Sequence, residues 1–511
     1  MTPGHVRWYH PTVFFVGLLL LLLAGGRSSF FRDPGTFWHV RTGELILDTG
    51  RFLDHDPYTF TFGGRPWTPY EWLAEVVMAG VHRAAGIDGL LLLSATVLSG
   101  TFTVLFVRLC RSGLHWALVG CLTGLAVAAS SAHFHARPHV LTIALLALTV
   151  LTLTDIDAGR RSVARLWWLV PAFVVWTNWH GGVLGGLGTV GLVGVGWLAF
   201  RFIGWPSPLH SGREVRELLA VSIALGLTVF ATPYGLSLPR TWLEIMGMSE
   251  LPSLIKEHAR VDPTEPSSWA FFALGAVYLV ALAGLRTRPR VAWLLPLVWL
   301  ALGCERVRHA PLFAVAAVVA VADFFPHTRW AARLANRPDL YQHPAEGIWP
   351  AGRLWLPSGA LIAALVLGCL GLQADGVRVP VVGAGWAEFP RADWPLDLIP
   401  HIKRETAGRT GGVPVFNEYE FGGFLIYFAP ECRPFVDDRC EVFGGRWLAE
   451  FAAAGRPGAD TAAAMGRWQA EYGRFDLALT HPQSGFDDYF RTHPGWEAVA
   501  TDSAGVLYRR R

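Results

Sequence analysis

The residues best suited to chemistry lie in one polar stretch, residues 32–72, directly after the first apolar segment of the chain. Only 16% of the 511 residues are charged, so a local concentration of titratable groups is unusual here. Carboxylates can act as general bases, and aromatic rings favour the membrane–water boundary. The stretch therefore predicts a reactive site at a membrane surface, built from Asp33, His39, Glu44, Asp54, His55, Asp56 and Glu71 among Trp38, Tyr58, Trp67, Tyr70 and Trp72.

Asp33 is the first candidate for a general base. It comes shortly after the apolar segment, and the following Pro34-Gly35 is typical of a turn that would hold its carboxylate at the membrane surface. The alternative is structural, because Asp is a preferred N-cap and a helix is expected over residues 37–47. Both interpretations stay open at this point.

Other acidic residues of the stretch could contact a substrate. Asp54 and Asp56 alternate in an extended segment, so both could point the same way and bind a divalent cation or sugar hydroxyls. The alternative is an Asx-turn before Pro57. Glu71 is either a substrate contact or a carboxylate at a helix start. His39 is a further expected substrate contact, but five residues separate it from Glu44, so the two are not paired as metal ligands.

A second group of candidates is basic or amide and lies at the ends of apolar segments. A charged side chain at membrane depth costs roughly 2.5–3.5 kcal/mol, so such residues reach for lipid headgroups or meet an anionic partner. Several of them with histidine and asparagine on one side of the membrane favour a phosphate or diphosphate group. The group comprises Arg137, His139, Asn178, His180, Arg306, Arg308 and His309.

Apolar segments organise the rest of the chain. With 52% hydrophobic residues and a mean hydropathy of +0.35, the composition is that of a multi-spanning α-helical membrane protein. The first span is expected to extend from about Trp8 to Ser29, and an interfacial helix is expected over 73–85. About eleven spans are predicted, at 12–28, 88–107, 116–132, 138–154, 166–178, 183–200, 218–233, 269–285, 291–303, 310–325 and 355–372.

The basic residues predict the orientation. The net charge of +3 is small, so no nucleic-acid partner is indicated. If the N-terminus is cytoplasmic, the loop 27–87 and the C-terminal tail lie outside the cytoplasmic (inner) membrane, and all five cytoplasmic loops are basic. These loops hold Arg108 and Arg111; Arg160, Arg161 and Arg165; Arg201, Arg213 and Arg216; Arg286, Arg288 and Arg290; and Arg329, Arg333, Arg337 and Arg353.

The chain changes character after the last span, so we expect a membrane part, 1–373, and a soluble extracytoplasmic α/β domain, 374–511. An exported domain permits a disulfide between Cys432 and Cys440. Strands are expected at 413–416, 434–436, 475–479, 496–501 and 506–508, with helices at about 445–454, 460–472 and 485–492.

Several motifs resemble a known superfamily. They are DPGTFWHVRTGELILDTGRFLDHDPYTFT, PYEWLAE, ARPHVLT, NWHGG, FNEYEFGGFLIYFAP and FVDDRCEVF. With an acidic residue just past the first span, a large aromatic outer loop and an outer C-terminal domain, the chain resembles the GT-C superfamily of polyprenyl-phosphate-sugar-dependent glycosyltransferases. That superfamily includes protein O-mannosyltransferases, the aminoarabinose transferase of lipid A and oligosaccharyltransferases. The motifs resemble more closely a bacterial group of GT-C-like membrane proteins.

The resemblance implies a membrane glycosyltransferase, a hexosyl or pentosyl transferase of inverting mechanism, that uses a polyprenyl-phosphate-linked sugar. Asp33 would match the catalytic carboxylate, and the basic outer residues would match the contacts to lipid phosphate. The chain lacks the adjacent Asp-Glu pair of the O-mannosyltransferases and the WWD signature of the oligosaccharyltransferases, so the acceptor stays open among a lipid, a glycan and a protein. Within the superfamily, metal-dependent and metal-independent members both occur. The alternative is a non-enzymatic transporter, or an assembly or binding protein for a cell-surface polymer.

Overall fold

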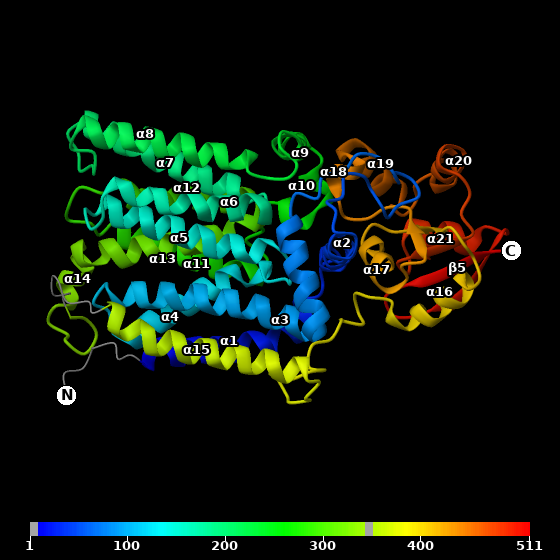
Figure 1. Ribbon diagram of the computed structural model, residues 1–511, viewed down its shortest axis with the longest axis horizontal. Coiled ribbons are helices and arrows are strands. Elements are labelled where there is room, and N and C mark those ends of the chain that lie inside the picture. The colour runs from blue at the N-terminus through cyan, green and yellow to red at the C-terminus, as the bar shows by residue number, and fades with distance from the viewer. Residues whose placement is uncertain (1–8, 343–350) are drawn as a thin grey trace.

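The computed structural model describes residues 9–342 and 351–511. A bundle of roughly parallel helices forms one end of the molecule, and a small sheet covered by helices forms the other (Figure 1). The first outer loop lies between them, with helix α2 (Gly35–Thr49) beside helix α17 (Phe421–Phe428) of the tail. The predicted combination of a helical membrane part with an α/β tail is confirmed.

Seven segments of the described chain are long and apolar enough to cross a membrane. They are Tyr9–Ser29 (α1), Trp72–Cys110 (α3), Trp116–His133 (α4, Trp116–Ser130, and a following turn), His139–Asp157 (α5), Val183–Phe202 (α7), Val307–His327 (α13, Ala310–Phe324, with flanking turns) and Pro357–Ala374 (within α15, Ala351–Ala374). The predicted end of the first span at Ser29 is confirmed, whereas its predicted start near Trp8 lies outside the described residues.

The remaining predicted spans correspond to shorter helices. These are α6 (Leu169–Trp179), α8 (Gly212–Leu227), α11 (Trp269–Leu282) and α12 (Val291–Glu305). They run alongside the longer helices of the bundle (Figure 1). Each is shorter than the roughly 20 residues that a perpendicular span needs. The count of eleven spans therefore stays a prediction.

A kink divides α3 into two helices. Gly86 has φ +61° and ψ −151°, a conformation that favours glycine, and it interrupts the helical backbone. The first part matches the helix predicted at 73–85 and runs across the end of the bundle before the second part enters it (Figure 1). Gly43 of α2 packs on this first part so closely that a Cβ atom there would lie 1.9 Å from the Glu75 carbonyl oxygen. This close approach places α2 directly against the start of α3.

The tail contains a five-stranded mixed sheet of order β2-β1-β3-β5-β4. β1 (Val413–Asn417) pairs in parallel with β2 (Cys432–Pro434) and β3 (Leu477–Thr480), while β5 (Val506–Arg510) is antiparallel to β3 and to β4 (Trp496–Thr501). The covering helices are α16 (Ile399–Thr406), α17, α19 (Gly445–Ala454), α20 (Thr461–Tyr472) and α21 (Gly485–Thr492).

Two predictions about the tail are wrong. The strand expected at 434–436 ends at Pro434, because the register pairs Val415 with Pro434 and the chain then leaves the sheet. The predicted disulfide is absent, since Cys432 and Cys440 are both free thiols. Cys432 is buried in β2 under one apolar cluster, whereas Cys440 begins the short helix α18 (Cys440–Phe443) against another.

The outer loop and the tail share their apolar cores. Phe37 of α2 is buried with Trp394 and Phe424, and Phe62 of the loop is buried among tail residues. The Thr61 hydroxyl donates a hydrogen bond to the Phe435 carbonyl oxygen at 2.6 Å. The outer loop and the tail, more than 370 residues apart in sequence at this contact, therefore pack as one unit at one end of the helical bundle. The division at residues 373 and 374 stays a prediction.

Candidate functional site

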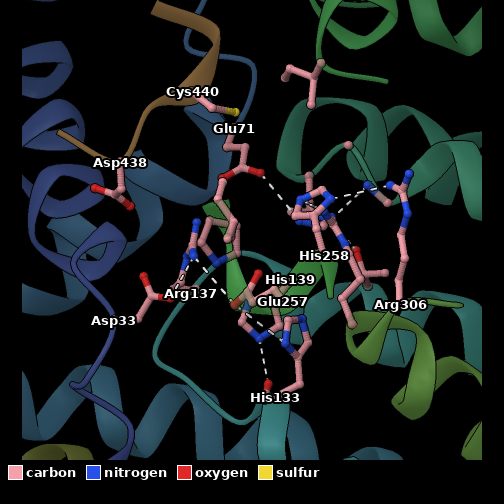
Figure 2. A pocket seen from close by; sticks show the side chains of 18 of the residues that line it. Asp33, Glu71, His133, Arg137, His139, Glu257, His258, Arg306, Asp438 and Cys440 are labelled. Atoms are coloured by element: carbon pink, nitrogen blue, oxygen red, sulfur yellow. Dashed lines mark hydrogen bonds and ion pairs between the residues drawn. The ribbon is translucent and has the colours of Figure 1, made fainter. Parts of the chain in front are cut away.

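A cavity of about 560 Å³ lies where the outer loop, the helix ends and the tail meet. Figure 2 shows its side chains converging from these three parts of the chain. Eight of the predicted site residues line it: Asp33, Glu71, Arg137, His139, His180, Arg306, Arg308 and His309. The sequence interpretation therefore identified much of the wall, although the residues come from segments far apart.

Asp33 and Arg137 form an ion pair on the cavity wall. One carboxylate oxygen of Asp33 accepts a hydrogen bond from Arg137 at 2.9 Å, and the other accepts one from the Gly35 backbone N–H at 2.8 Å. Gly35 is the first residue of α2, so the carboxylate assists the helix start and also faces the cavity. The two interpretations of Asp33 are thus compatible in space. Arg137 also lies 3.9 Å from the Glu257 carboxylate.

Glu71 reaches the cavity at the start of α3 with a histidine behind it. Its carboxyl oxygens lie 3.2 Å from His39 Nε2 and 3.6 Å from His180 Nε2. His39 is fully buried, and its Nδ1 lies 3.1 Å from the Glu75 carboxylate. The close packing of α2 on α3 places His39 behind Glu71 and outside the cavity lining, so a direct contact between His39 and a substrate stays a prediction that this placement does not favour.

Burial raises the pKa of Glu71 to about 8, with Arg137 opposing the shift and Glu441 adding to it. The unfolded chain loses this proton near the ordinary value of 4.5, so folding costs progressively more free energy as the pH rises from 4.5 to about 8. We expect Glu71→Gln to raise the melting temperature relative to wild type at pH 8, and the difference to shrink towards pH 5. Thermal unfolding in detergent across this pH range measures the effect. A constant difference would contradict it.

Two arginines on the opposite wall have no acidic partner. Arg308 Nη1 donates to His258 Nε2 at 2.7 Å, and Arg306 Nη1 lies 3.4 Å from His258 Nδ1. Neither guanidinium forms an ion pair with a carboxylate of the described chain. Both face the cavity, so this wall carries two positive charges that are available to an anion.

His139 and Asn178 have different surroundings. The His139 ring lines the cavity, and its Nε2 donates to the His133 carbonyl oxygen at 2.8 Å. Asn178 lies outside the lining, so its role as a substrate contact stays a prediction that this placement does not favour. It accepts a hydrogen bond from the Trp72 ring N–H at 2.7 Å and donates to the carbonyl oxygens of Val174 and Ala231, which satisfies its amide within the helix packing.

The structure also separates Asp54 and Asp56, which were predicted to point the same way and form one site. The Asp54 side chain is 83% exposed beside His55, whereas the Asp56 side chain is fully buried against Arg439. Asp56 accepts the Tyr58 backbone N–H at 3.1 Å, which is the alternative Asx-turn. Neither residue lines the cavity. Across the described residues, no group of three or more His, Cys, Asp or Glu side chains is arranged to hold a metal ion.

The sequence interpretation missed the residues that the tail and the 234–268 segment contribute. Asp438 accepts the Trp38 ring N–H at 2.9 Å, and Glu441 accepts that of Trp67 at 3.0 Å. Burial and the nearby Asp33 raise the pKa of Asp438 to about 8, against the opposing effect of Arg137. The available signal was the charged run DDRCE in an otherwise apolar part of the tail. Glu257 and His258 gave no such signal.

Comparison with known proteins supports one fold. Neither a family model nor a curated protein matches the chain. The oligosaccharyltransferase of Archaeoglobus fulgidus in its apo form superposes with a TM-score of 0.51 at 11% identity, over 93% of this chain and 70% of that one. AglB from the same organism, in complex with an inhibitory peptide and a dolichol-phosphate, gives 0.51 at 12% identity over the same shares. This chain therefore has the same fold as these oligosaccharyltransferase structures, in agreement with the GT-C resemblance of its motifs.

Another solved structure aligns with this chain over nearly its whole length. ArnT from Cupriavidus metallidurans, bound to undecaprenyl phosphate, has a TM-score of 0.49 at 16% identity, over 97% of both chains. The superposition on the two oligosaccharyltransferase structures confirms the fold that the resemblance implies. In this GT-C fold the cavity lies at the end of the helical bundle that faces the tail, with Asp33 and Arg137 on its wall.

Proposed function

We propose that this protein is an integral-membrane glycosyltransferase that moves a sugar from a polyprenyl-phosphate carrier to a hydroxyl group of a lipid, glycan or protein. The observation that carries the proposal is the set of side chains that line one cavity, at the end of the helical bundle that faces the tail. It combines a carboxylate, Asp33, with two arginines, Arg306 and Arg308, that lack acidic partners in the described chain. The GT-C fold supports the same class of reaction, and one similar structure holds a dolichol-phosphate.

The proposed reaction is an inverting transfer of a hexosyl or pentosyl group. The acceptor oxygen forms a bond to the anomeric carbon while the bond from that carbon to the phosphate oxygen breaks, and the phosphate leaves with the electron pair. Asp33 takes the proton from the acceptor hydroxyl. Arg306 and Arg308 offset the charge that grows on the phosphate, and Arg137, His139, His180 and His309 complete the polar wall. Glu71 contacts the sugar.

A divalent cation does not enter this scheme. One similar structure, the Archaeoglobus fulgidus oligosaccharyltransferase, is a complex with Zn and sulfate. In this chain the carboxylates that were expected to bind a cation, Asp54 and Asp56, face different surroundings, and Asp56 is neutralised by Arg439. These two residues do not fit a metal site, so no step is assigned to a metal.

Lipid binding tests the proposal directly. We expect Arg308→Ala to weaken binding of undecaprenyl phosphate roughly 10-fold or more, because a hydrogen bond between charged groups contributes about 1.5–3 kcal/mol. Native mass spectrometry or tryptophan fluorescence measures the affinity. Arg260→Ala is the matched control, since Arg260 is 79% exposed and paired with Glu305 at 3.0 Å. Equal affinity in wild type and Arg308→Ala would refute the phosphate site.

We also propose that the cavity faces the outside of the cytoplasmic membrane, with the N-terminus in the cytoplasm. Helix α14 (Arg329–Leu334), which carries two arginines of the last basic loop, lies at the end of the bundle away from the tail (Figure 1), in agreement with the positive-inside rule. Reporter fusions at Asp157 and Arg288 should behave as cytoplasmic, and a fusion after Gln373 should behave as exported. A cytoplasmic signal from the last fusion would reverse the orientation.

A further inference from the structure

His258 contacts both of the arginines on the phosphate wall, and the scheme above gives it no role. It ends a short 3-10 turn, Lys256–His258, and only 7% of its surface is exposed. Figure 2 shows His258 beside Arg306, and the imidazole nitrogens lie 2.7 Å from Arg308 Nη1 and 3.4 Å from Arg306 Nη1. The imidazole therefore sits between two cations.

Two neighbouring guanidinium groups repel each other, and a carboxylate placed between them would reduce this repulsion. Both acidic residues that adjoin this group in sequence are engaged elsewhere. Glu305, next to Arg306, pairs with Arg260 at 3.0 Å, and Glu257, next to His258, faces His133 at 3.7 Å and Arg137 at 3.9 Å. Neither arginine therefore forms an ion pair with a carboxylate of the described residues, although Arg308 lies near enough to Glu71 and Glu257 to lower the pKa of both carboxyl groups.

A neutral imidazole can accept one hydrogen bond. The 2.7 Å contact from Arg308 assigns Nε2 as the accepting nitrogen, which leaves the proton on Nδ1, where the contact to Arg306 is longer at 3.4 Å. Burial, followed by the charges of Arg308 and Arg306, lowers the pKa of His258 to about 3, in agreement with a neutral ring. A neutral acceptor orients a guanidinium group and adds no charge to the wall.

We propose that His258 is a positioning residue that holds Arg308, with Arg306 beside it, as an uncompensated pair of cations for the phosphate of the lipid carrier. The proposal rests on the proposed function for the identity of the anion. A carboxylate at this position would hold the arginines equally well but would cancel part of the charge that attracts phosphate. Neutrality of the side chain, rather than its contact alone, is the property that matters.

Three substitutions separate contact from charge. His258→Gln keeps a neutral acceptor and should bind undecaprenyl phosphate within about threefold of wild type. His258→Ala removes the acceptor and should weaken binding roughly 10-fold. His258→Glu should weaken binding more than His258→Ala does, while its melting temperature equals or exceeds that of wild type. Uncharged undecaprenol is the comparison ligand, and its binding should not change in any variant.

The outcomes are distinct. Wild-type affinity in His258→Glu, or a His258→Gln variant as weak as His258→Ala, would overturn the positioning role. Wild-type protein that binds undecaprenyl phosphate no better than undecaprenol would count against the proposed lipid donor. In that case inorganic pyrophosphate tests the role of His258. Pyrophosphate should raise the melting temperature most in wild type and His258→Gln, less in His258→Ala and least in His258→Glu. A different order would overturn the positioning role.

Discussion

Asp33→Asn should abolish sugar transfer, with a loss of at least about 100-fold, while the protein still folds and inserts. A positioned general base contributes roughly 10²–10⁴-fold to a rate, and an amide cannot accept the proton. The size of the side chain is kept, and the amide oxygen can still accept the Gly35 backbone N–H that Asp33 accepts at 2.8 Å. Transfer of a radiolabelled sugar from a polyprenyl-phosphate donor in membranes measures the effect.

Two controls make this result specific. Asn can still accept the Gly35 N–H, so the start of α2 should persist, but loss of the ion pair with Arg137 at 2.9 Å should lower the melting temperature; activity is therefore compared at a temperature where both proteins are folded. Asp48→Asn is the matched substitution on the same helix, because Asp48 is 64% exposed and pairs with Arg83 at 2.6 Å; it should keep wild-type activity. If Asp33→Asn transfers sugar at the wild-type rate, Asp33 is not the general base and serves only the start of the helix. If neither protein transfers sugar, the alternative of a non-enzymatic binding protein is favoured.

Arg439→Met should destabilise the protein by about 3–5 kcal/mol, the cost of removing one partner from a buried ion pair. Arg439 is fully buried and forms ion pairs with Asp56 at 2.7 Å and Asp437 at 2.6 Å. Its guanidinium group also lies 4.4 Å from the ring centroid of Trp67. Without it, two carboxylates stay buried between the outer loop and the tail. Thermal unfolding and protease sensitivity of the outer loop in detergent measure the loss.

The matched controls come from the same loop. Asp54→Asn should leave the melting temperature unchanged, because Asp54 is exposed, whereas Asp56→Asn combined with Arg439→Met should recover part of the stability by removing one unpaired charge. A wild-type melting temperature for Arg439→Met would show that water reaches this ion pair, and that it does not hold the loop to the tail.

The amino-acid sequence alone was enough to predict a helical membrane part joined to an α/β tail, together with part of the cavity wall. Insertion into a bilayer depends on the length of each apolar segment, and the polar residues therefore lie mostly in the loops between these segments. For this reason Asp33, Arg137 and Arg308 could be grouped on one side of the membrane before any contact was known. The α/β character of the tail followed in the same way from short apolar runs between polar segments.

Only the tertiary structure decided which of these residues share the cavity. Asp54 and Asp56 are alike in sequence, but Asp56 is neutralised by Arg439, which lies 383 residues later. His39 is drawn behind Glu71 because Gly43 lets α2 approach α3, and Asp438 enters the wall because the tail packs on the outer loop. Hydropathy and loop charge predict the helix end at which a residue lies, whereas the partner of a buried charge depends on packing between segments hundreds of residues apart.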